Sequence, residues 1–337
     1  MKKQILILAL LLPLLAGCAA KQPVPLPCTP GEAQRLVVYT SHKEEVYTPI
    51  IREFEERTGI WVDVVSGGTN ELLQRIQQEA DAPKADVMFG GGVESLESYQ
   101  DCFSPYICRE AAGISEQFQA ESGYWTPFSA LPVVLVYNTK LVAPESLTSW
   151  KDLESPAFRG KIAFADPQIS GSSYTALVTR LQTGGGMEDS LTRLCTALDG
   201  KQLDSSGAVL TAVADGSALV GITLEETALQ HIAAGEDIAL VYPSDGTSCV
   251  PDGSALVKGA PHGDNARLFL DFTVSTDVQS MVGQRFCRRT VRADIPADPS
   301  LPPLSTLNMV SYDVEWASQN RERLLSEWSF LLGGVPS

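Results

Sequence analysis

The chain has 337 residues, 44% of them hydrophobic and 20% charged, a balance that suits a globular protein with room for two α/β lobes. Its formal net charge is −16 at pH 7, so phosphate backbones repel its surface and nucleic acid is excluded as an expected partner. Beyond residue 17, no apolar stretch approaches the roughly 20 residues that a membrane-spanning helix needs.

The first eighteen residues are typical of an export signal. Lys2 and Lys3 precede an almost wholly apolar run over 5–16, which is too short to span a bilayer. The run ends in Leu15-Ala16-Gly17-Cys18, which resembles the lipobox of bacterial lipoproteins, where the cysteine thiol receives a diacylglycerol. We therefore expect 1–17 to be a signal peptide and Cys18 to be lipidated. The chain would then be anchored to a bacterial membrane in an extracytoplasmic space, at a periplasmic face or an outer surface.

Residues 18–34 contain four prolines and show no hydrophobic periodicity. This composition favours an extended, semi-rigid spacer. We expect this segment to tether the lipidated cysteine to the folded body.

From residue 35 onward, short apolar runs alternate with segments that are apolar at helical spacing. The expected strands are 36–39, 60–65, 86–89, 132–137, 161–164, 218–222, 238–242 and 255–257. The expected helices are 46–54, 71–80, 174–181, 267–274, 278–286 and 314–332. Such alternation is typical of βαβ units and predicts two α/β sets, each with a mostly parallel sheet, joined by extended segments.

The turns from strand to helix hold the candidate binding residues, because ligands of parallel α/β sheets bind beyond the carboxyl ends of the strands. Free N–H groups and hydroxyls at a helix start can also bind an anion. The turn at 170–174 is the strongest candidate, since its three serines around Gly171 exceed what capping requires. The candidate residues are Thr40, Ser41, His42, Gly68, Thr69, Asn70, Gly91, Ser170, Gly171, Ser172, Ser173, Tyr174, Thr223, Glu225 and Glu226.

Each turn also has a purely structural interpretation. Ser41-x-x-Glu44 and Thr223-x-x-Glu226 both fit the capping box, in which the side chains satisfy only their own helix. Capping is the more common role for any single turn. Five such turns facing one cleft would favour ligand binding.

Catalytic signatures are absent from the sequence. It contains no Gly-x-Ser-x-Gly elbow, no His-Glu-x-x-His and no Walker A loop. Of the three histidines, only His42 lies in a candidate turn, while His231 lies on an expected helix and His262 in a Pro-Gly turn. The sequence indicates a binding protein without a cofactor rather than an enzyme.

Six cysteines remain besides Cys18, and an exported protein can retain disulfides. Cys102 and Cys108 are close in sequence and are separated by a turn-forming Pro105, which makes them the pair most easily joined. Six cysteines allow fifteen connectivities, so the pairing of Cys28 and Cys195 stays open. No Cys-x-x-Cys spacing occurs that would indicate a zinc ribbon or a thioredoxin-like site.

The tract Ser149-Trp150-Lys151-Asp152-Leu153, followed by Gly160-Lys161-Ile162 and Asp166-Pro167, resembles a signature of ABC-importer solute-binding proteins. The branch that it resembles is the ferric-iron-type extracellular family, which also contains binders of phosphonates, sugar phosphates, thiamine and putrescine. Further similarity extends over roughly 35–295 and is carried by 38–41, 67–73, 165–175, 220–225, 251–261 and 288–292.

This resemblance implies the periplasmic-binding-protein type 2 fold, in which two lobes close on a solute around hinge strands. Residues 35–132 and 254–290 would form lobe one, and 133–253 would form lobe two, with helices of 291–337 packing across. The resemblance also implies a monomer that delivers its solute to an ABC permease and ATPase. The resemblance also places Cys249 and Cys287 in neighbouring loops, which predicts a second disulfide between them.

Three hypotheses for the ligand and role follow from the resemblance. The first is a small anionic solute, namely a phosphate ester, sugar phosphate or phosphonate, held by the serines of 170–173 with Thr40, Ser41 and Thr69 opposite. Glu225 or Glu226 would bind a hydroxyl or amine, and an arginine cluster could add charge at Arg288, Arg289 and Arg292.

The second hypothesis is a ferric-iron binder that uses Tyr174, Tyr242, His42 or Glu226. The chain lacks the adjacent tyrosine pair that is common among ferric binders. The third hypothesis is a partner that presents its ligand to a membrane sensor kinase, without transport.

Overall fold

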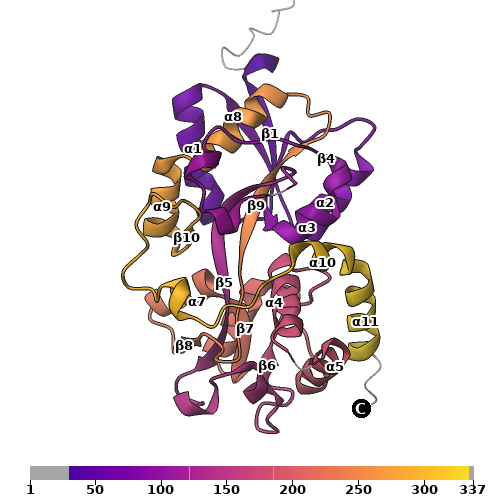
Figure 1. The fold of residues 1–337 in the computed structure, drawn as a ribbon, viewed down its shortest axis with the longest axis vertical. Helices are drawn as coiled ribbons and strands as arrows, with labels where there is room; N and C mark the ends of the chain where they lie inside the picture. Colours follow the sequence, from indigo (N-terminus) through magenta and orange to yellow (C-terminus); the bar gives the residue numbers. More distant parts are fainter. Residues whose placement is uncertain (1–29, 121, 185, 334–337) are drawn as a thin grey trace, which may run out of the picture.

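The computed structural model describes residues 30–120, 122–184 and 186–333 and has two lobes stacked along the long axis of the molecule (Figure 1). The predicted signal peptide, Cys18, Cys28 and most of the predicted tether lie outside these residues. None of the helices in these ranges combines the length and the apolar character that crossing a membrane requires.

Lobe one is built on three parallel strands, in which β1 pairs with β2 on one side and β3 on the other. Val38 of β1 is thereby aligned with both Val64 and Val87, and its buried side chain joins a core that also contains Phe54 and Phe269. The strands are β1 (Arg35–Thr40), β2 (Trp61–Ser66), β3 (Val87–Gly92) and the short β4 (Phe103–Ser104). The helices are α1 (Glu44–Thr58), α2 (Thr69–Gln78), α3 (Val93–Ser98), α8 (Gly263–Thr273) and α9 (Thr276–Phe286).

Lobe two has its own sheet and a core that includes Trp150, Phe164, Tyr174 and Trp328. Its strands are β6 (Ile162–Ala163), β7 (Val220–Leu224) and β8 (Ile238–Val241). Its helices are α4 (Gly171–Gln182), α5 (Met187–Leu198), α6 (Ser206–Ala214) and α7 (Glu225–Ala233). The C-terminal α10 (Val314–Gln319) and α11 (Arg321–Gly333) run down the side of the molecule, and α10 also contacts α3 of lobe one (Figure 1).

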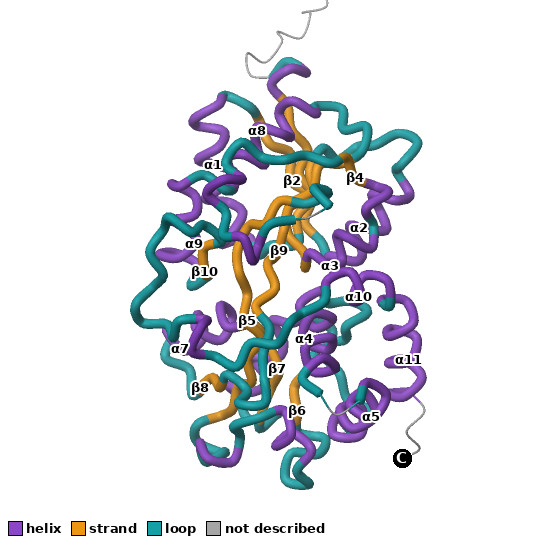
Figure 2. Tube along the Cα trace, in the orientation of Figure 1, coloured by secondary structure: helices purple, strands orange, loops and turns teal. Residues whose placement is uncertain are grey.

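Two long strands, β5 (Thr126–Asn138) and β9 (Cys249–Val257), connect the lobes through the middle of the molecule (Figure 2). They pair antiparallel, with Ala130 opposite Pro251, and the short β10 (Arg289–Thr290) pairs with the other edge of β5. The predicted lobe boundaries at 132/133 and 253/254 fall within these two strands. Because the strands that cross between the lobes pair antiparallel with their neighbours, the sheets are mixed, with more antiparallel pairing than the sequence predicted.

Several elements differ from the expectation. Helices α3, α5 and α6 were not expected, and the helix predicted over 314–332 is two helices that meet at Asn320. Asp313 caps the first of them by accepting a hydrogen bond from the N–H of Trp316 at 2.8 Å. The break matters because it starts α11 at Arg321, which faces the boundary between the lobes.

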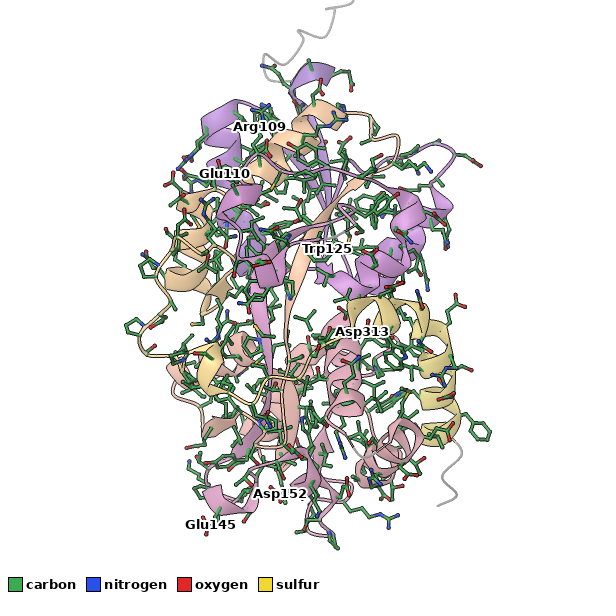
Figure 3. The ribbon with its side chains drawn as sticks, viewed as in Figure 1. Arg109, Glu110, Trp125, Glu145, Asp152 and Asp313 are labelled. Atoms are coloured by element: carbon green, nitrogen blue, oxygen red, sulfur yellow. The ribbon has the colours of Figure 1, made fainter. Side chains whose placement is uncertain are left out.

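The tract around Trp150 is structural. The Ser149 hydroxyl and N–H both donate to Asp152, which completes a capping box for the short helix η6 (Trp150–Glu154). The buried Trp150 indole donates to the carbonyl of Gly246 at 2.9 Å. Asp152 lies at the end of lobe two that is far from the hinge (Figure 3).

The predicted disulfides are not formed, since Cys102, Cys108, Cys249 and Cys287 all carry free thiols. Cys102 packs on the core beside Phe103, whereas Cys108 is buried in a separate cluster. Cys249 lies on β9, while Cys287 ends α9 just before β10, on the other side of β5. Strands two apart in a sheet are separated by about 9–10 Å, which exceeds the roughly 7 Å that a disulfide can bridge between Cα atoms.

Candidate ligand-binding site

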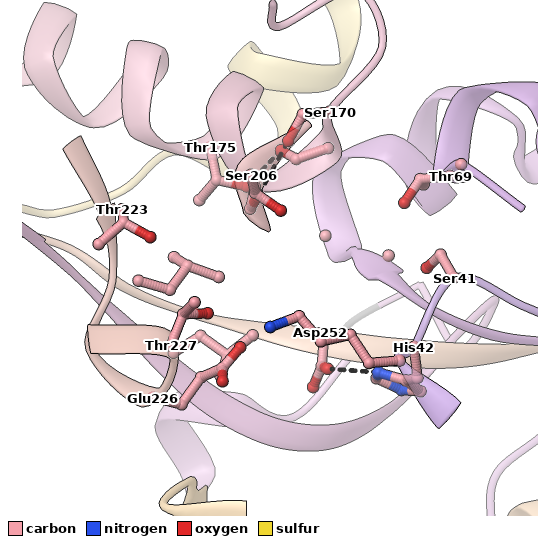
Figure 4. Close-up of a pocket in the computed structure, with 18 of the residues that line it drawn as sticks. Ser41, His42, Thr69, Ser170, Thr175, Ser206, Thr223, Glu226, Thr227 and Asp252 are labelled. Atoms are coloured by element: carbon pink, nitrogen blue, oxygen red, sulfur yellow. Dashed lines mark hydrogen bonds and ion pairs between the residues drawn. The ribbon is translucent and has the colours of Figure 1, made fainter. Parts of the chain in front are cut away.

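A cavity of about 360 Å³ lies between the lobes against the hinge strand β9 (Figure 4). Its volume is within the range of about 300–1,000 Å³ for small-molecule sites. Of the residues predicted from the sequence, those that line the cavity are Ser41, His42, Gly68, Thr69, Gly91, Ser170, Gly171, Ser172, Thr223 and Glu226. Arg288, from the predicted arginine cluster, also lines it. Further lining residues are Lys43, Gly92, Leu131, Ile169, Thr175, Asp204, Ser205, Ser206, Leu224, Thr227, Val250, Pro251 and Asp252.

Four helices begin at the wall of this cavity. The first residues of α2 and α4, Thr69 and Gly171, both line it. The first residue of α6, Ser206, also lines it, and α7 starts directly after the lining residue Leu224. Since the first four N–H groups of a helix lack partners inside the helix, these termini place backbone donors and partial positive charge at one site. The arrangement suits an anion.

Hydrogen bonding separates the hydroxyls that cap helices from those that do not. Ser170 and Ser205 cap α4 and α6, each accepting from a backbone N–H at 3.3 Å. Ser41 and Thr223 do not cap: α1 and α7 have Lys43 and Leu224 at their N-caps, without a side-chain cap hydrogen bond. The two capping boxes that the sequence suggested are therefore not formed, and both of these hydroxyls line the cavity.

Charged side chains form one wall of the cavity around Arg288. Its Nη1 donates to Asp252 Oδ2 at 2.7 Å and to Ser129 Oγ at 3.0 Å, and its Nη2 donates to Glu226 Oε1 at 3.3 Å. Burial opposes the charge, but the two carboxylates raise the pKa of Arg288 above its ordinary value. Its Nε is buried without a partner, which leaves one donor of this arginine unused.

His42 completes this wall next to Asp252. Its Nδ1 lies 3.7 Å from Asp252 Oδ2 (Figure 4). Its ring packs edge-on against Phe89. Burial, and then the positive charge of Arg288, lower the pKa of His42 well below its ordinary value. The imidazole is therefore neutral at pH 7, whereas burial raises the pKa of Asp252 despite the neighbouring Arg288.

Four predicted residues hold the structure around the cavity rather than lining it. Thr40 shapes the first turn, because its hydroxyl donates to the Phe89 carbonyl at 2.8 Å. Ser173 is buried behind the wall. Asn70 bridges the lobes, donating to the Gln168 carbonyl and accepting from Arg321, and the Tyr174 hydroxyl donates to the carbonyl of Ala317.

The adjacent residues Glu225 and Glu226 face different surroundings. Glu226 lines the cavity, while Glu225 lies outside it and accepts two hydrogen bonds from Arg289 at 2.7 and 2.8 Å. The hydroxyl of Tyr242 also donates to Glu225. Burial first, and then Glu225, raise the pKa of Tyr242, so this phenol stays protonated and is held by its neighbour.

Sequence reasoning missed the turn at Asp204, Ser205 and Ser206, because the helix that follows it was not recognised. Two serines directly before the apolar residues of 208–213 could have indicated that helix start. Lys43 and Asp252 gave no local signal. Asp252 reaches the site only through the antiparallel pairing of β9 with β5.

Comparisons with known proteins agree with this architecture. Residues 36–285 match the family described as bacterial extracellular solute-binding protein. The periplasmic binding protein AfuA of Actinobacillus pleuropneumoniae, solved with fructose 6-phosphate bound, superposes with a TM-score of 0.83 at 25% identity, covering 89% of this chain and 98% of that one. Iron uptake protein A1 of Synechocystis is 26% identical, covering 86% of this chain and 84% of its own length. A ferric binding protein of Campylobacter jejuni shares the fold, with a TM-score of 0.77 at 18% identity over 88% of this chain and 99% of that one.

The two-lobe α/β fold, the cavity between the lobes and the match over 36–285 lead to one assignment. The chain belongs to the bacterial extracellular solute-binding protein family, and is a non-catalytic, extracellular solute-binding protein.

Proposed function

We propose that this protein captures a small phosphorylated or phosphonate solute in the cavity between its lobes and delivers it to an ABC permease and ATPase. The observation that carries the proposal is the meeting of four helix N-termini at one cavity that is also lined by Arg288. Hydroxyls that do not cap any helix, such as those of Ser41 and Thr223, add further donors. Backbone N–H groups at helix starts are suited to phosphate oxygens.

The anion would bind at the starts of α4 and α6. The hydroxyls of Ser170 and Ser172 lie 3.0 Å apart, and Ser206 lies at the start of the neighbouring helix. Because Ser170 already caps α4, Ser172 and Ser206 supply the side-chain donors in this part of the cavity. Thr69 approaches from lobe one, so the anion would contact both lobes (Figure 4).

The remainder of the solute would face Glu226, Thr227 and Asp252. Both carboxylates are partnered by Arg288, so they can accept hydrogen bonds from hydroxyl groups without requiring a cationic ligand. This polarity supports a sugar phosphate in particular. The relative AfuA, with fructose 6-phosphate bound, is consistent with that class of solute.

Ferric iron receives less support from the side chains. Tyr174 and Tyr242, the tyrosines considered as iron ligands, both donate hydrogen bonds within the protein and do not line the cavity. Within the described ranges, no group of three or more His, Cys, Asp or Glu residues is arranged to hold a metal ion. Our proposal therefore places an anion rather than a metal in the cavity.

A binding screen tests the solute class. We expect fructose 6-phosphate or 2-aminoethylphosphonate to raise the melting temperature, because a ligand that binds only the folded state stabilises it by mass action. Inorganic phosphate reports the anion subsite alone, and Fe³⁺-citrate tests iron. A rise in melting temperature with Fe³⁺-citrate and with none of the phosphorus compounds would contradict the proposal.

Adjacent serines offer a matched pair of variants. Ser172→Ala should weaken binding of fructose 6-phosphate by roughly 10- to 150-fold, since hydrogen bonds to charged groups contribute about 1.5–3 kcal/mol. Ser173→Ala should leave the affinity unchanged, because Ser173 does not line the cavity. Titration calorimetry measures the affinity of both variants for fructose 6-phosphate. Equal affinities would show that Ser172 does not bind the solute.

The lipid anchor on Cys18 stays a prediction, because that residue lies outside the described part of the chain. We propose that it holds the binding protein close to its permease, since tethering raises the effective concentration of the solute-loaded form. A sensor-kinase role remains the alternative, which a neighbouring kinase gene in place of permease and ATPase genes would favour.

A further inference from the structure

A buried polar cluster lies next to the ligand cavity, where α3 of lobe one meets α4 and the C-terminal helices (Figure 1). We call it the Glu94 cluster, and it consists of Glu94, Tyr174, Thr175, Tyr312 and Arg321. Glu94 comes from lobe one, whereas the other four come from α4, α11 and the segment before α10. Thr175 also lines the cavity, so the cluster and the binding site share a wall.

Only one of the two carboxyl oxygens of Glu94 has a hydrogen-bond partner. The side chain is fully buried, and its Oε1 accepts a hydrogen bond from the Thr175 hydroxyl. Its Oε2 is buried and has no hydrogen-bond partner. An ionised carboxylate in such a position would lack most of the donors that replace its hydration, whereas a protonated carboxyl loses far less on burial.

Arg321 supplies the positive charge of the cluster, but its guanidinium contacts Asn70 and Tyr174 rather than the Glu94 carboxyl group. Its Nη2 donates to Asn70 Oδ1, and its guanidinium lies 4.8 Å from the centre of the Tyr174 ring. Tyr312 contributes a buried hydroxyl without a partner. Burial outweighs the Thr175 hydrogen bond and the charge of Arg321, and raises the pKa of Glu94 above its ordinary value.

Separation of the lobes would change these surroundings. Thr175 and Tyr174 of α4 and Arg321 of α11 approach Glu94 from lobe two and the C-terminal helices, whereas Tyr312 packs against the cores of both lobes. Parting the lobes would take Thr175 away from Glu94 and open this side of the carboxyl group to water. The other acid of α3, Glu97, would not change in this way, because it bonds to Trp125 and Ser122 of its own lobe. Closure therefore buries one particular carboxyl group.

We propose that closure of the lobes takes up a proton at Glu94, so that this protein captures solute together with a proton and holds it more tightly as the pH falls. When the lobes are apart, water reaches Glu94 and its carboxyl group ionises with the ordinary pKa of a glutamate. When they close, the carboxyl group must be neutral. Between the ordinary pKa of the open form and the raised pKa of the closed form, each further pH unit should therefore disfavour closure by up to about tenfold.

The first test uses the protein without solute and so does not depend on the proposed ligand. Small-angle X-ray scattering of the mature chain at pH 4.5 and pH 8.5 should give a smaller radius of gyration at the lower pH. Glu94→Gln, whose amide cannot ionise, should give the compact value at both pH values. Glu97→Gln, on the same helix, should behave as the wild type does.

The second test measures the proton directly. At a pH between the ordinary and the raised pKa of Glu94, titration calorimetry with fructose 6-phosphate in buffers of different ionisation enthalpy should show about one proton more taken up by wild type than by Glu94→Gln. The difference between the two proteins cancels the ionisation of the phosphate itself. Equal radii at both pH values, or identical behaviour of Glu94→Gln and wild type, would overturn the proposal. If fructose 6-phosphate does not bind, the sugar-phosphate assignment fails while the scattering comparison still decides the role of Glu94.

Discussion

Neighbouring residues of the same type have different roles in this site. Glu225 pairs with Arg289 outside the cavity, and Glu226 faces the cavity beside Arg288. Similarly, Ser172 lines the cavity while Ser173 is buried behind it. Since successive helical residues point about 100° apart, only one member of such a pair can face a given surface.

Arg288 gives a prediction at this scale. Arg288→Met leaves Asp252 and Glu226 buried without their partner, so we expect the free energy of unfolding to fall by about 3–5 kcal/mol. Urea unfolding measures the loss. Arg267→Met, which removes an exposed pair with Asp264, is the control and should leave the midpoint unchanged. Equal midpoints for the two variants would show that the buried cluster does not depend on Arg288.

The thiols give a second prediction at the residue scale. Mass mapping of non-reduced peptides should find free thiols at Cys102, Cys108, Cys249 and Cys287. Burial raises the pKa of Cys108 to about 11, so its thiolate is scarce at neutral pH and alkylation of the folded protein should be slow. A melting temperature that falls on addition of reductant would contradict this assignment.

At the scale of elements, α4 connects the cavity to the boundary between the lobes. Its first turn lines the cavity, where we propose that it binds the anion, and its next residues, Tyr174 and Thr175, contact the C-terminal helices and Glu94. The hinge strand β9 forms the opposite wall through Pro251 and Asp252. The same two elements thus line the cavity and contact the other lobe.

A histidine bonded to two carboxylates at the start of lobe one, which we call the His262 clasp, gives a prediction for the pH dependence of stability. His262 Nδ1 lies 2.8 Å from Asp86 Oδ2, and His262 Nε2 lies 3.2 Å from Glu32 Oε2 in the short helix η1 (Glu32–Gln34). Burial alone would lower the pKa of His262, but its bonds to these carboxylates raise it above the ordinary value. Its stabilising contribution is therefore complete below about pH 6.5 and is lost as the pH rises through the raised pKa.

Thermal unfolding of His262→Gln tests the clasp. The variant should melt about 2–4 °C below the wild type at pH 5.5, the shift that about 1 kcal/mol causes in a domain of 150–250 residues. The difference in melting temperature between the variant and the wild type should be smaller at pH 9. A difference that is constant with pH would rule out the charged clasp.

At the scale of the whole molecule, the overall charge and the site have opposite character. The chain carries a formal net charge of −16, yet the cavity collects helix N-termini and Arg288. Because solvent and salt screen surface charges beyond about 8–10 Å, nearby donors determine which solute binds. The acidic surface is therefore compatible with a buried site for a small anion.

The sequence alone determined the local chemistry of this protein. Apolar periodicity predicted β1–β3, α1 and α2, and the hydroxyl-rich turns predicted where donors would stand, because both signals depend on residues that are close along the chain. The family resemblance, carried by motifs such as 149–153, predicted the two-lobe fold, which the comparison with AfuA confirms.

Only the tertiary structure decided which of those residues serve the site. The pairing of β9 with β5 brings Asp252 to the cavity and to Arg288, and the same pairing keeps Cys249 and Cys287 on opposite sides of β5. The environment of the buried Glu94 carboxyl group depends on a hydrogen bond from Thr175, 81 residues away in the sequence. Such contacts arise when distant segments pack together, and no local pattern in the sequence records them.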